Sequence, residues 1–384
     1  MLIAATAAQA AIASITFGLP AIGPELADAY DLSLAELGGV LTAGLLGGAL
    51  SLIVAGMAVD RVGARLPTLV GTALASGGLL VAATAQSKAT LFVALVVSGV
   101  GTSVSPIAGT GAIFRAYPPA RRGWALGVRQ MSVPLGGTIA AVAMPWISHR
   151  HGTGAALVFA AAAIWVTGIS FGLLAGTTAT PKAARIRRPF RVIWGAAGIQ
   201  RLLVIAALYI TVLQAAVSFS IPSMRSAGLT AFVASAMFFA INITAVVSRV
   251  VWGHIADRGG GVRRTRTLVD VGAVACIGAV CFTLALHVGV FAVLPAAILF
   301  GFGALGWNGL IYLSAGERAV PELAARAIAV VATVVYLFSA ISAPLLGALA
   351  DAAGWTAFWL VVGLLAAAGA LLASTLPAAA GVAR

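Results

Sequence analysis

Long apolar runs, separated by short charged or turn-rich segments, cover almost the whole chain. Each run approaches the roughly 20 residues that a helix needs to cross a hydrocarbon core about 30 Å thick. Strands of a membrane barrel would be far shorter and would alternate, so the pattern predicts an all-α integral membrane protein. About twelve spans are predicted, at residues 2–24, 34–57, 66–86, 89–114, 123–147, 153–176, 199–224, 229–254, 267–286, 290–313, 325–350 and 354–376.

The composition excludes an ordinary soluble protein. Of the 384 residues, 61% are hydrophobic and 9% are charged, and the mean hydropathy is +1.08. A soluble chain carries charge at about 25% of its positions. Cys276 and Cys281 share one apolar stretch on different helix faces, which suits neither a disulfide nor a metal site. We therefore expect membrane lipid around the chain and neither a metal nor a cofactor.

The net charge of +13 is a signal of topology. When successive loops are assigned to alternate sides, 20 of the 23 Lys and Arg residues fall on one side, and Lys88, Arg150 and Arg225 fall on the other. By the positive-inside rule the crowded side is cytoplasmic, so both termini are expected there. This predicts a bacterial cytoplasmic (inner) membrane protein and argues against a nucleic acid partner.

The longest polar stretch, residues 177–198, divides the chain into two halves that resemble each other faintly. Features of the first half return in the second after a shift of about 200 residues, which predicts a six-span unit duplicated in parallel. The predicted organisation is an N-terminal six-helix bundle (1–176), a cytoplasmic linker (177–198) and a C-terminal six-helix bundle (199–384), related by pseudo-twofold symmetry. The matched positions are Gln9 with Gln214, Gly56 with Gly253, Asp60 with Asp257, Arg61 with Arg258, and Gly99 with Gly301.

A doubled loop motif resembles the signature of a known family. G-M-A-V-D-R-V-G-A-R occupies residues 56–65 between the second and third spans, and G-H-I-A-D-R-G-G-G-V-R-R occupies residues 253–264 between the eighth and ninth. The pattern is similar to the loop motif of the major facilitator superfamily (MFS), which repeats it at this place in its second half. The resemblance covers the whole chain, and no subfamily is assigned. It implies two six-helix bundles around a central site that opens alternately to either side of the membrane.

The loop motif also has a physical role that its residue types indicate. Gly56 permits close contact between helices, and Asp60 can accept hydrogen bonds from the N-terminus of a neighbouring helix. Arg61 and Arg65 hold the loop at the cytoplasmic face. We expect a gating role for the whole set, which is Gly56, Asp60, Arg61, Gly63, Arg65, Gly253, Asp257 and Arg258.

Polar residues inside the spans are costly and are therefore candidates for solute contact. Arg129 lies about 12 Å into its span, at roughly 1.5 Å per residue, and can face an aqueous cavity or reach back to the interface. Glutamines at such positions can line a cavity or bond a neighbouring helix. Arg249 alone is expected to anchor the membrane interface. The predicted substrate cavity contains Gln9, Arg129, Gln214, Asn242, Trp307 and Asn308, of which Trp307 and Asn308 offer an aromatic wall and an amide.

The charges near the cavity indicate the class of solute. Glu25 lies near the outer end of its span and Asp270 near the inner end, so the cavity is neutral to positive and favours a small anionic or neutral amphipathic solute. Proton coupling stays open, with Glu25 or a carboxylate of the solute as the carrier. The fourth span lacks the Arg that many proton-coupled relatives place before the pair Gly99 and Gly101. The fifth span has Val133 where the antiporter signature has Gly, and both departures argue against a standard drug/proton antiporter.

The predicted function is secondary active transport of a small organic solute by a monomer. Two alternatives stay open, a drug or metabolite efflux antiporter and a ligand sensor with a transporter fold that does not transport. An enzyme is not predicted. Ser170, in G-I-S-F-G, lies in an apolar helix without a matching base and acid at membrane depth, and the chain has no P-loop for ATP.

Overall fold

The structure is a computed structural model that describes residues 1–175, 189–258 and 260–377. The regular elements within these ranges are all helices, which confirms the predicted all-α class. Residues 177–188 of the predicted linker lie outside the described residues, and its remainder contains the short helix α10 (Pro189–Trp194).

The described helices account for twelve membrane spans. Ten helical stretches are long and apolar enough to cross a membrane. The longest helix, α16 (Ala324–Ser374), contains Gly354 at a φ of 75°, a left-handed conformation that glycine adopts at little cost, so α16 is two spans joined at a kink. The apolar helix α1 (Leu2–Ala21) supplies the twelfth. The predicted integral membrane class is therefore confirmed.

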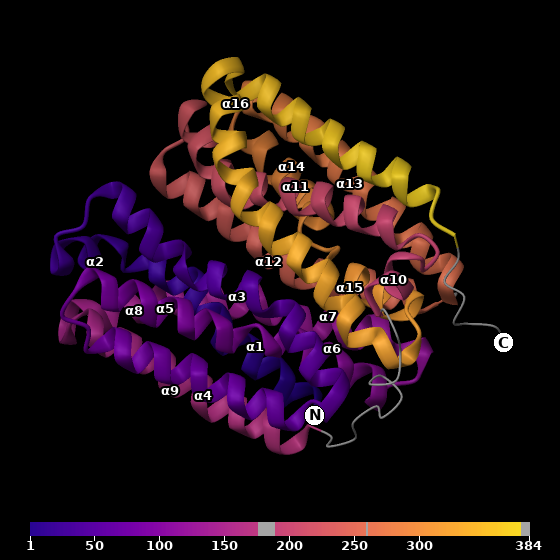
Figure 1. Ribbon diagram of the computed structural model, residues 1–384. Coiled ribbons are helices and arrows are strands. Elements are labelled where there is room, and N and C mark those ends of the chain that lie inside the picture. The colour runs from indigo at the N-terminus through magenta and orange to yellow at the C-terminus, as the bar shows by residue number, and fades with distance from the viewer. Residues whose placement is uncertain (176–188, 259, 378–384) are drawn as a thin grey trace. The chain divides into compact units, whose positions relative to one another are not determined.

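The chain folds into two compact units, and each unit draws on separated segments. Unit 1 comprises Met1–Ala116, Ser132–Pro189 and Pro321–Tyr336. Within it, α4 packs against both α5 and α9, and α1 packs against α8 and α9 (Figure 1). Besides α1 and the start of α16, its helices are α2 (Gly23–Tyr30), α3 (Leu34–Val62), α4 (Arg65–Ala83), α5 (Lys88–Thr102), α6 (Val104–Ala116), α8 (Ser132–His151) and α9 (Thr153–Leu174).

Unit 2 comprises Tyr117–Met131, Phe190–Val320 and Leu337–Arg384. Its core holds edge-to-face aromatic contacts, with the Trp359 ring 5.0 Å from Phe282 and 5.3 Å from Phe300. Besides α10 and most of α16, its helices are α7 (Arg122–Gln130), α11 (Ile199–Ser226), α12 (Ala231–Asp257), α13 (Gly260–Val288), α14 (Val290–Ala304) and α15 (Asn308–Arg318), with the 3-10 turn Pro119–Arg121 before α7. A second 3-10 turn, Pro321–Leu323, precedes α16 in unit 1.

The two units do not follow the halves predicted from the sequence. Helix α7 comes from the first half but packs within unit 2, against α12 and α15. The first part of α16 comes from the second half but packs within unit 1. The two domains 1–176 and 199–384 were inferred from the repeat in the sequence, and they stay a prediction.

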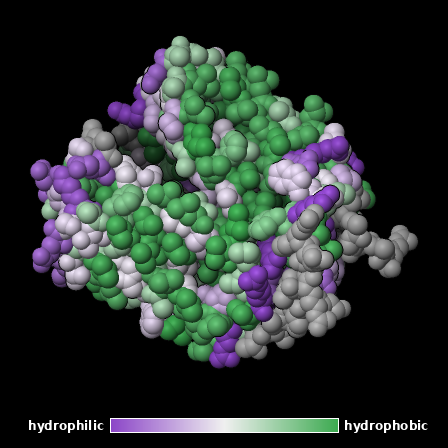
Figure 2. Space-filling model, in the orientation of Figure 1, coloured by the Kyte–Doolittle hydropathy of each residue, from purple (hydrophilic) through white to green (hydrophobic). Residues whose placement is uncertain are grey.

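Large apolar side chains are exposed along the helices. Phe291 is 95% exposed, Leu50 is 72% exposed and Val142 is 70% exposed. Figure 2 shows broad hydrophobic areas on the viewed face and hydrophilic residues gathered toward the helix ends. Surfaces this apolar would promote association in water, whereas in a bilayer they are the surface that faces the lipid tails.

Candidate functional site

One span is interrupted at residues 305–307, between α14 and α15. The gaps between α5 and α6 and between α7 and α8 are each one residue long, and Ser103 and Met131 keep helical dihedral angles there. The stretches Lys88–Ala116, Pro119–His151 and Val290–Arg318 are each long and apolar enough to cross a membrane, in agreement with the predicted spans 89–114, 123–147 and 290–313. An interrupted span offers backbone polar groups to a side chain or a solute.

Arg249 of α12 joins the end of α14 to the end of α7 within unit 2. Its Nε donates to the carbonyl oxygen of Leu305 at 2.9 Å, and its Nη1 donates to that of Gln130 at 2.5 Å. Both carbonyls lie at helix ends, where the backbone lacks an intrahelical donor. The side chain is buried. The expectation that Arg249 anchors the membrane interface was wrong, because its donors find backbone acceptors inside the unit.

Arg129 lies in the last turn of α7 and is fully buried, with 0% exposure. The surrounding helices approach closely through glycines. A Cβ at Gly309 of α15 would lie 3.4 Å from the carbonyl carbon of Leu126, and Gly127 faces the backbone of Arg249. In this conformation the Arg129 side chain is enclosed by protein and reaches neither an open cavity nor the membrane interface.

Trp307 and Asn308 lie at the break between α14 and α15. Trp307 is buried, its Nε1 donates to the carbonyl oxygen of Ala304 at 3.0 Å, and its ring lies 6.0 Å from the Tyr209 ring of α11. The indole therefore fills the interior of unit 2. The Oδ1 of Asn308 is buried and accepts no hydrogen bond from the described residues. Asn308 thus places an amide oxygen at an interrupted span, where a donor from a solute could pair with it.

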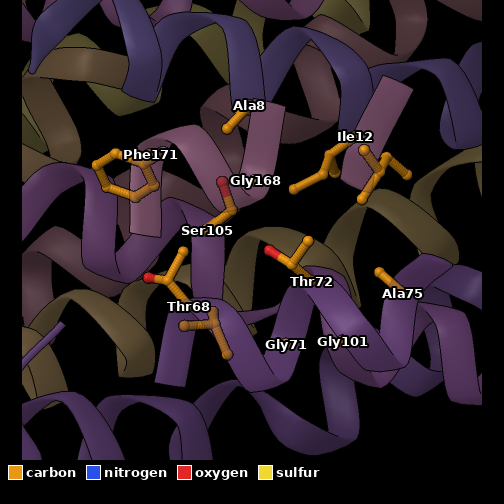
Figure 3. Close-up of a pocket in the computed structure, with 12 residues that line it drawn as sticks. Ala8, Ile12, Thr68, Gly71, Thr72, Ala75, Gly101, Ser105, Gly168 and Phe171 are labelled. Carbon is orange, nitrogen blue, oxygen red and sulfur yellow. The ribbon is translucent and has the colours of Figure 1, made fainter. Parts of the chain in front are cut away.

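Gln9 is bonded inside unit 1, where the Ser105 hydroxyl lies 3.4 Å from its Oε1. Ser105 also lines a small cavity together with the hydroxyl side chains Thr68 and Thr72 and with Phe171 (Figure 3). The cavity measures about 10 Å³, which is room for about one water molecule. It is too small for an organic solute.

The other two cavity candidates bond backbone carbonyls in unit 2. Gln214 Nε2 of α11 donates to Ser339 of α16 at 3.1 Å. Asn242 Nδ2 donates at 2.9 Å to Phe238, one turn earlier on its own helix. Gln9 therefore lies in unit 1, and Arg129, Gln214, Asn242, Trp307 and Asn308 lie in unit 2. Both glutamines make the interhelical bonds of the packing alternative, and their contact with solute stays a prediction.

Asp60 lies at the beginning of another helix. Its carboxylate faces the backbone N–H groups of Ala325 and Arg326 in the first turn of α16. Its Oδ2 lies 3.1 Å from Nε of Arg326, and both side chains are buried. A negative charge at a helix N-terminus is stabilised by the free N–H groups and the helix dipole. The gating role of Asp60 stays a prediction, and the helix that it faces is one that the sequence did not name.

Asp257, the counterpart of Asp60 in the repeat, caps α7 in unit 2. Its Oδ1 accepts a hydrogen bond from the N–H of Gly123, and its Oδ2 accepts one from Trp124, both at 2.8 Å. Nη2 of Arg264 lies 3.6 Å from Oδ1 of Asp257, and the same guanidinium pairs with Glu317. In both repeats, therefore, a carboxylate at the end of one span holds the first turn of another helix.

Three charged partners of these carboxylates, Arg264, Glu317 and Arg326, were not among the predicted site residues. All three are buried or nearly so. Their signal in the sequence is a charge placed within the end of an apolar span, where it needs a partner. Hydropathy marks such a charge as the limit of the span and does not show which charge it meets.

The remaining motif residues shape the loop ends. A Cβ on Gly56 would lie 2.8 Å from Cβ of Ala329, so the glycine permits the close contact between α3 and α16. Gly63 ends α3 at a φ of 80°, which favours glycine. Arg65, the first residue of α4, is half-buried, and Arg61 and Arg258 are exposed.

Gly253→Ala is expected to lower the transport rate about tenfold. A Cβ at this position would lie 2.7 Å from the carbonyl carbon of Gly123 and closer still to its oxygen. Relieving that overlap separates α12 from α7 and weakens both bonds of Asp257, at a cost of about 1–3 kcal/mol. The measurement is the solute exchange rate in proteoliposomes. Gly77→Ala is the matched control, because a Cβ there has nothing within 4 Å, and equal rates in the two variants would contradict the close-contact role.

The apolar spans, with a buried carboxylate at the end of α3 and another at the end of α12, define a helical integral membrane protein. The sequence profile of the Major Facilitator Superfamily matches residues 2–343, and the chain belongs to this family. Its members are secondary transporters, and the chain is not an enzyme. An uncharacterized MFS-type transporter of Mycobacterium tuberculosis, found in two strains, is 24% identical over 365 residues, which cover 90% of this chain and 78% of the relative.

Solved structures of the same family share the fold. The proton:xylose symporter XylE superposes with a TM-score of 0.81 at 13% identity, covering 99% of this chain and 96% of the other. The human organic anion transporter MFSD10 gives a TM-score of 0.75 at 15% identity, with 97% and 98% covered. The Escherichia coli fucose:proton symporter FucP gives 0.72 at 15% identity, with 96% and 97% covered. At these identities the likeness shows the fold alone.

Proposed function

We propose that the chain moves a small organic solute across a bacterial cytoplasmic membrane by alternating access. The observation that carries the proposal is the matched pair of carboxylates, Asp60 at α16 and Asp257 at α7. Each carboxylate lies at the first turn of a helix beside a buried guanidinium, and Asp257 also accepts two backbone hydrogen bonds. A movement of that helix would break these contacts as a set. Such a contact has a closed and an open state. A solute that binds one of these states more tightly shifts the population toward that state.

The proposed solute is anionic or neutral and amphipathic. Unit 2 buries the cations Arg129 and Arg249 and places the Asn308 amide oxygen at an interrupted span. A solute carboxylate suits the guanidinium groups, and a solute hydroxyl can donate to the amide oxygen. The structural neighbours include an organic anion transporter and two proton-coupled sugar symporters, so both solute classes and proton coupling have precedent in this fold. Glu25 or a solute carboxylate is the proposed proton carrier, and the proposed transporting species is a monomer.

Counterflow in proteoliposomes tests the proposal. Vesicles that contain the purified protein and a high internal concentration of an unlabelled organic acid or sugar should transiently accumulate the same labelled compound. Vesicles without protein are the control. If a compound stabilises the protein in a thermal-shift assay but never exchanges, the chain is the non-transporting sensor. Efflux of cationic drugs driven by a pH gradient would instead favour the drug antiporter.

Replacement of Arg129 tests the anionic class of solute. Arg129→Gln is expected to reduce the affinity for an anionic solute at least about tenfold, and Arg129→Lys to reduce it less, because lysine keeps the charge but loses the bidentate geometry. Since Arg129 is enclosed here, it meets the solute in a conformation in which α7, α12 and α15 have moved apart. Binding is measured on folded protein, with Arg150→Gln, at an exposed position outside the loop motif, as the control. Equal affinities in all variants would show that the solute needs no guanidinium from Arg129.

Cysteine labelling tests the proposed orientation. In a chain whose Cys276 and Cys281 are replaced by serine, Arg187→Cys is expected to resist an impermeant maleimide applied to intact cells, because the basic side is cytoplasmic. Arg150→Cys, on the other side, is expected to react. Labelling of Arg187→Cys from outside would reverse the orientation of the chain and both of its termini.

A further inference from the structure

A hollow of about 500 Å³ opens in unit 2 where two spans end. One wall is the beginning of α7 and the turn before it, and the other is the last turn of α12. Both walls lie at the limits of membrane-spanning stretches, Pro119–His151 and Phe232–Asp257, on the side that the basic residues assign to the cytoplasm. The hollow is lined by Tyr117, Ala120, Arg121, Trp124, His254, Asp257 and Arg258.

The charge inside the hollow is positive. Arg121 and Arg258 are both exposed to it, and the Arg258 guanidinium lies 3.2 Å from Nε2 of His254. The carboxylate that lines the hollow, Asp257, accepts hydrogen bonds from two backbone N–H groups. It also faces the buried Arg264, which pairs with Glu317 as well, and Glu317 has Arg122 as a second cation nearby. The guanidinium groups of Arg121 and Arg258 are thus left to attract an anion, and guanidinium binds phosphate oxygens in a bidentate geometry.

Aromatic rings stand beside these charges. Trp124 is 37% exposed, and its ring lies 6.4 Å from that of Tyr117. Trp and Tyr are enriched at the boundary between membrane and water, where the ring meets lipid and its polar edge meets water. Basic pockets between helices on the cytoplasmic side bind the headgroups of acidic lipids. A soluble anion would make no use of the apolar rings, whereas a lipid would use both features.

We infer that this hollow binds the headgroup of an acidic phospholipid such as phosphatidylglycerol, with Arg121 and Arg258 on its phosphate and Trp124 beside its glycerol. The two walls are also the elements that Asp257 holds together through Gly123 and Trp124. A bound lipid therefore stabilises the conformation in which α7 and α12 are in contact. The assignment to the cytoplasmic leaflet rests on the proposed orientation of the chain. The acidic headgroup is inferred from the arginines and aromatic rings that line the hollow.

Lipid titration of the purified full-length protein tests the inference. The protein is held in micelles of a neutral detergent with phosphatidylcholine, phosphatidylglycerol is added in steps, and the unfolding midpoint is followed. Phosphatidylglycerol should raise the midpoint of the wild type. In the double variant Arg121→Gln, Arg258→Gln the apparent affinity should fall roughly tenfold to thirtyfold, as expected for two lost cationic contacts. Arg150→Gln is the matched control, since Arg150 also stands beside a tryptophan, 4.6 Å above the ring of Trp146, but outside the hollow.

Two results would overturn the inference. If the double variant, confirmed as folded by circular dichroism and size-exclusion chromatography, responded to phosphatidylglycerol as the wild type does, the two arginines would not form the site. If inorganic phosphate or glycerol 1-phosphate raised the midpoint as much as phosphatidylglycerol does, the ligand would be a soluble anion and not a lipid. Neither result would affect the counterflow test of transport.

Discussion

Replacement of Asp60 by asparagine is expected to lower the transport rate at least about tenfold while the protein still reaches the membrane in nearly normal amount. Asparagine caps a helix about as well as aspartate, so the approach to the N–H groups of Ala325 and Arg326 can persist. The substitution removes the negative charge of Asp60, so the buried Arg326 guanidinium loses its partner. Breaking a buried ion pair in this way costs roughly 3–5 kcal/mol, and each 1.4 kcal/mol is about tenfold in a population.

The control for this prediction removes a carboxylate of the same kind from an exposed site. Asp28→Asn lies on a short helix outside the motif, is exposed, and should transport at the wild-type rate. Rates are measured by counterflow and normalised to the amount of folded protein. Arg326→Gln added to Asp60→Asn should recover part of the loss, because the charge left unpaired is then gone. A normal rate in Asp60→Asn alone would remove the gating role of this carboxylate.

Arg249→Met is expected to have the largest effect on the stability of the folded protein. Methionine keeps the unbranched apolar stem but leaves the carbonyl oxygens of Leu305 and Gln130 without their donor. A buried acceptor without a partner costs about 1–3 kcal/mol, so the two together cost roughly 2–6 kcal/mol. The unfolding midpoint in detergent should fall clearly. The midpoint of Arg249→Lys, which can keep one of the bonds, should lie between those of Arg249→Met and the wild type.

Arg225 provides a matched control for Arg249. It also donates from Nη1 to a backbone carbonyl, that of Leu229 at 2.8 Å, but it does so at an exposed helix end where water can replace it. Arg225→Met should therefore change the free energy of unfolding by no more than about 0.5 kcal/mol relative to the wild type. If Arg249→Met unfolded at the wild-type midpoint, the guanidinium would not be what joins the end of α14 to the end of α7.

The interruption at residues 305–307 shows where the sequence pattern stops being informative. Hydropathy averages over a span, and a break of three residues inside an apolar run changes that average very little. The residues at this break are common inside membrane helices, so no turn signal marks it. The free carbonyl groups of Leu305 and Gln130 find a donor only in a distant side chain, Arg249.

The all-α membrane class and the resemblance to the MFS can be read from the sequence alone. Span length, hydropathy, the placement of basic residues and the doubled motif are properties of short segments and need no knowledge of contacts. The partners of the motif carboxylates depend on the tertiary structure. Asp257 and Gly123 are 134 residues apart in the chain, and nothing local to either residue shows that a carboxylate at the end of one span caps the first turn of α7. The burial of Arg249 was decided in the same way, because a guanidinium stays inside a membrane protein only where distant backbone acceptors meet it.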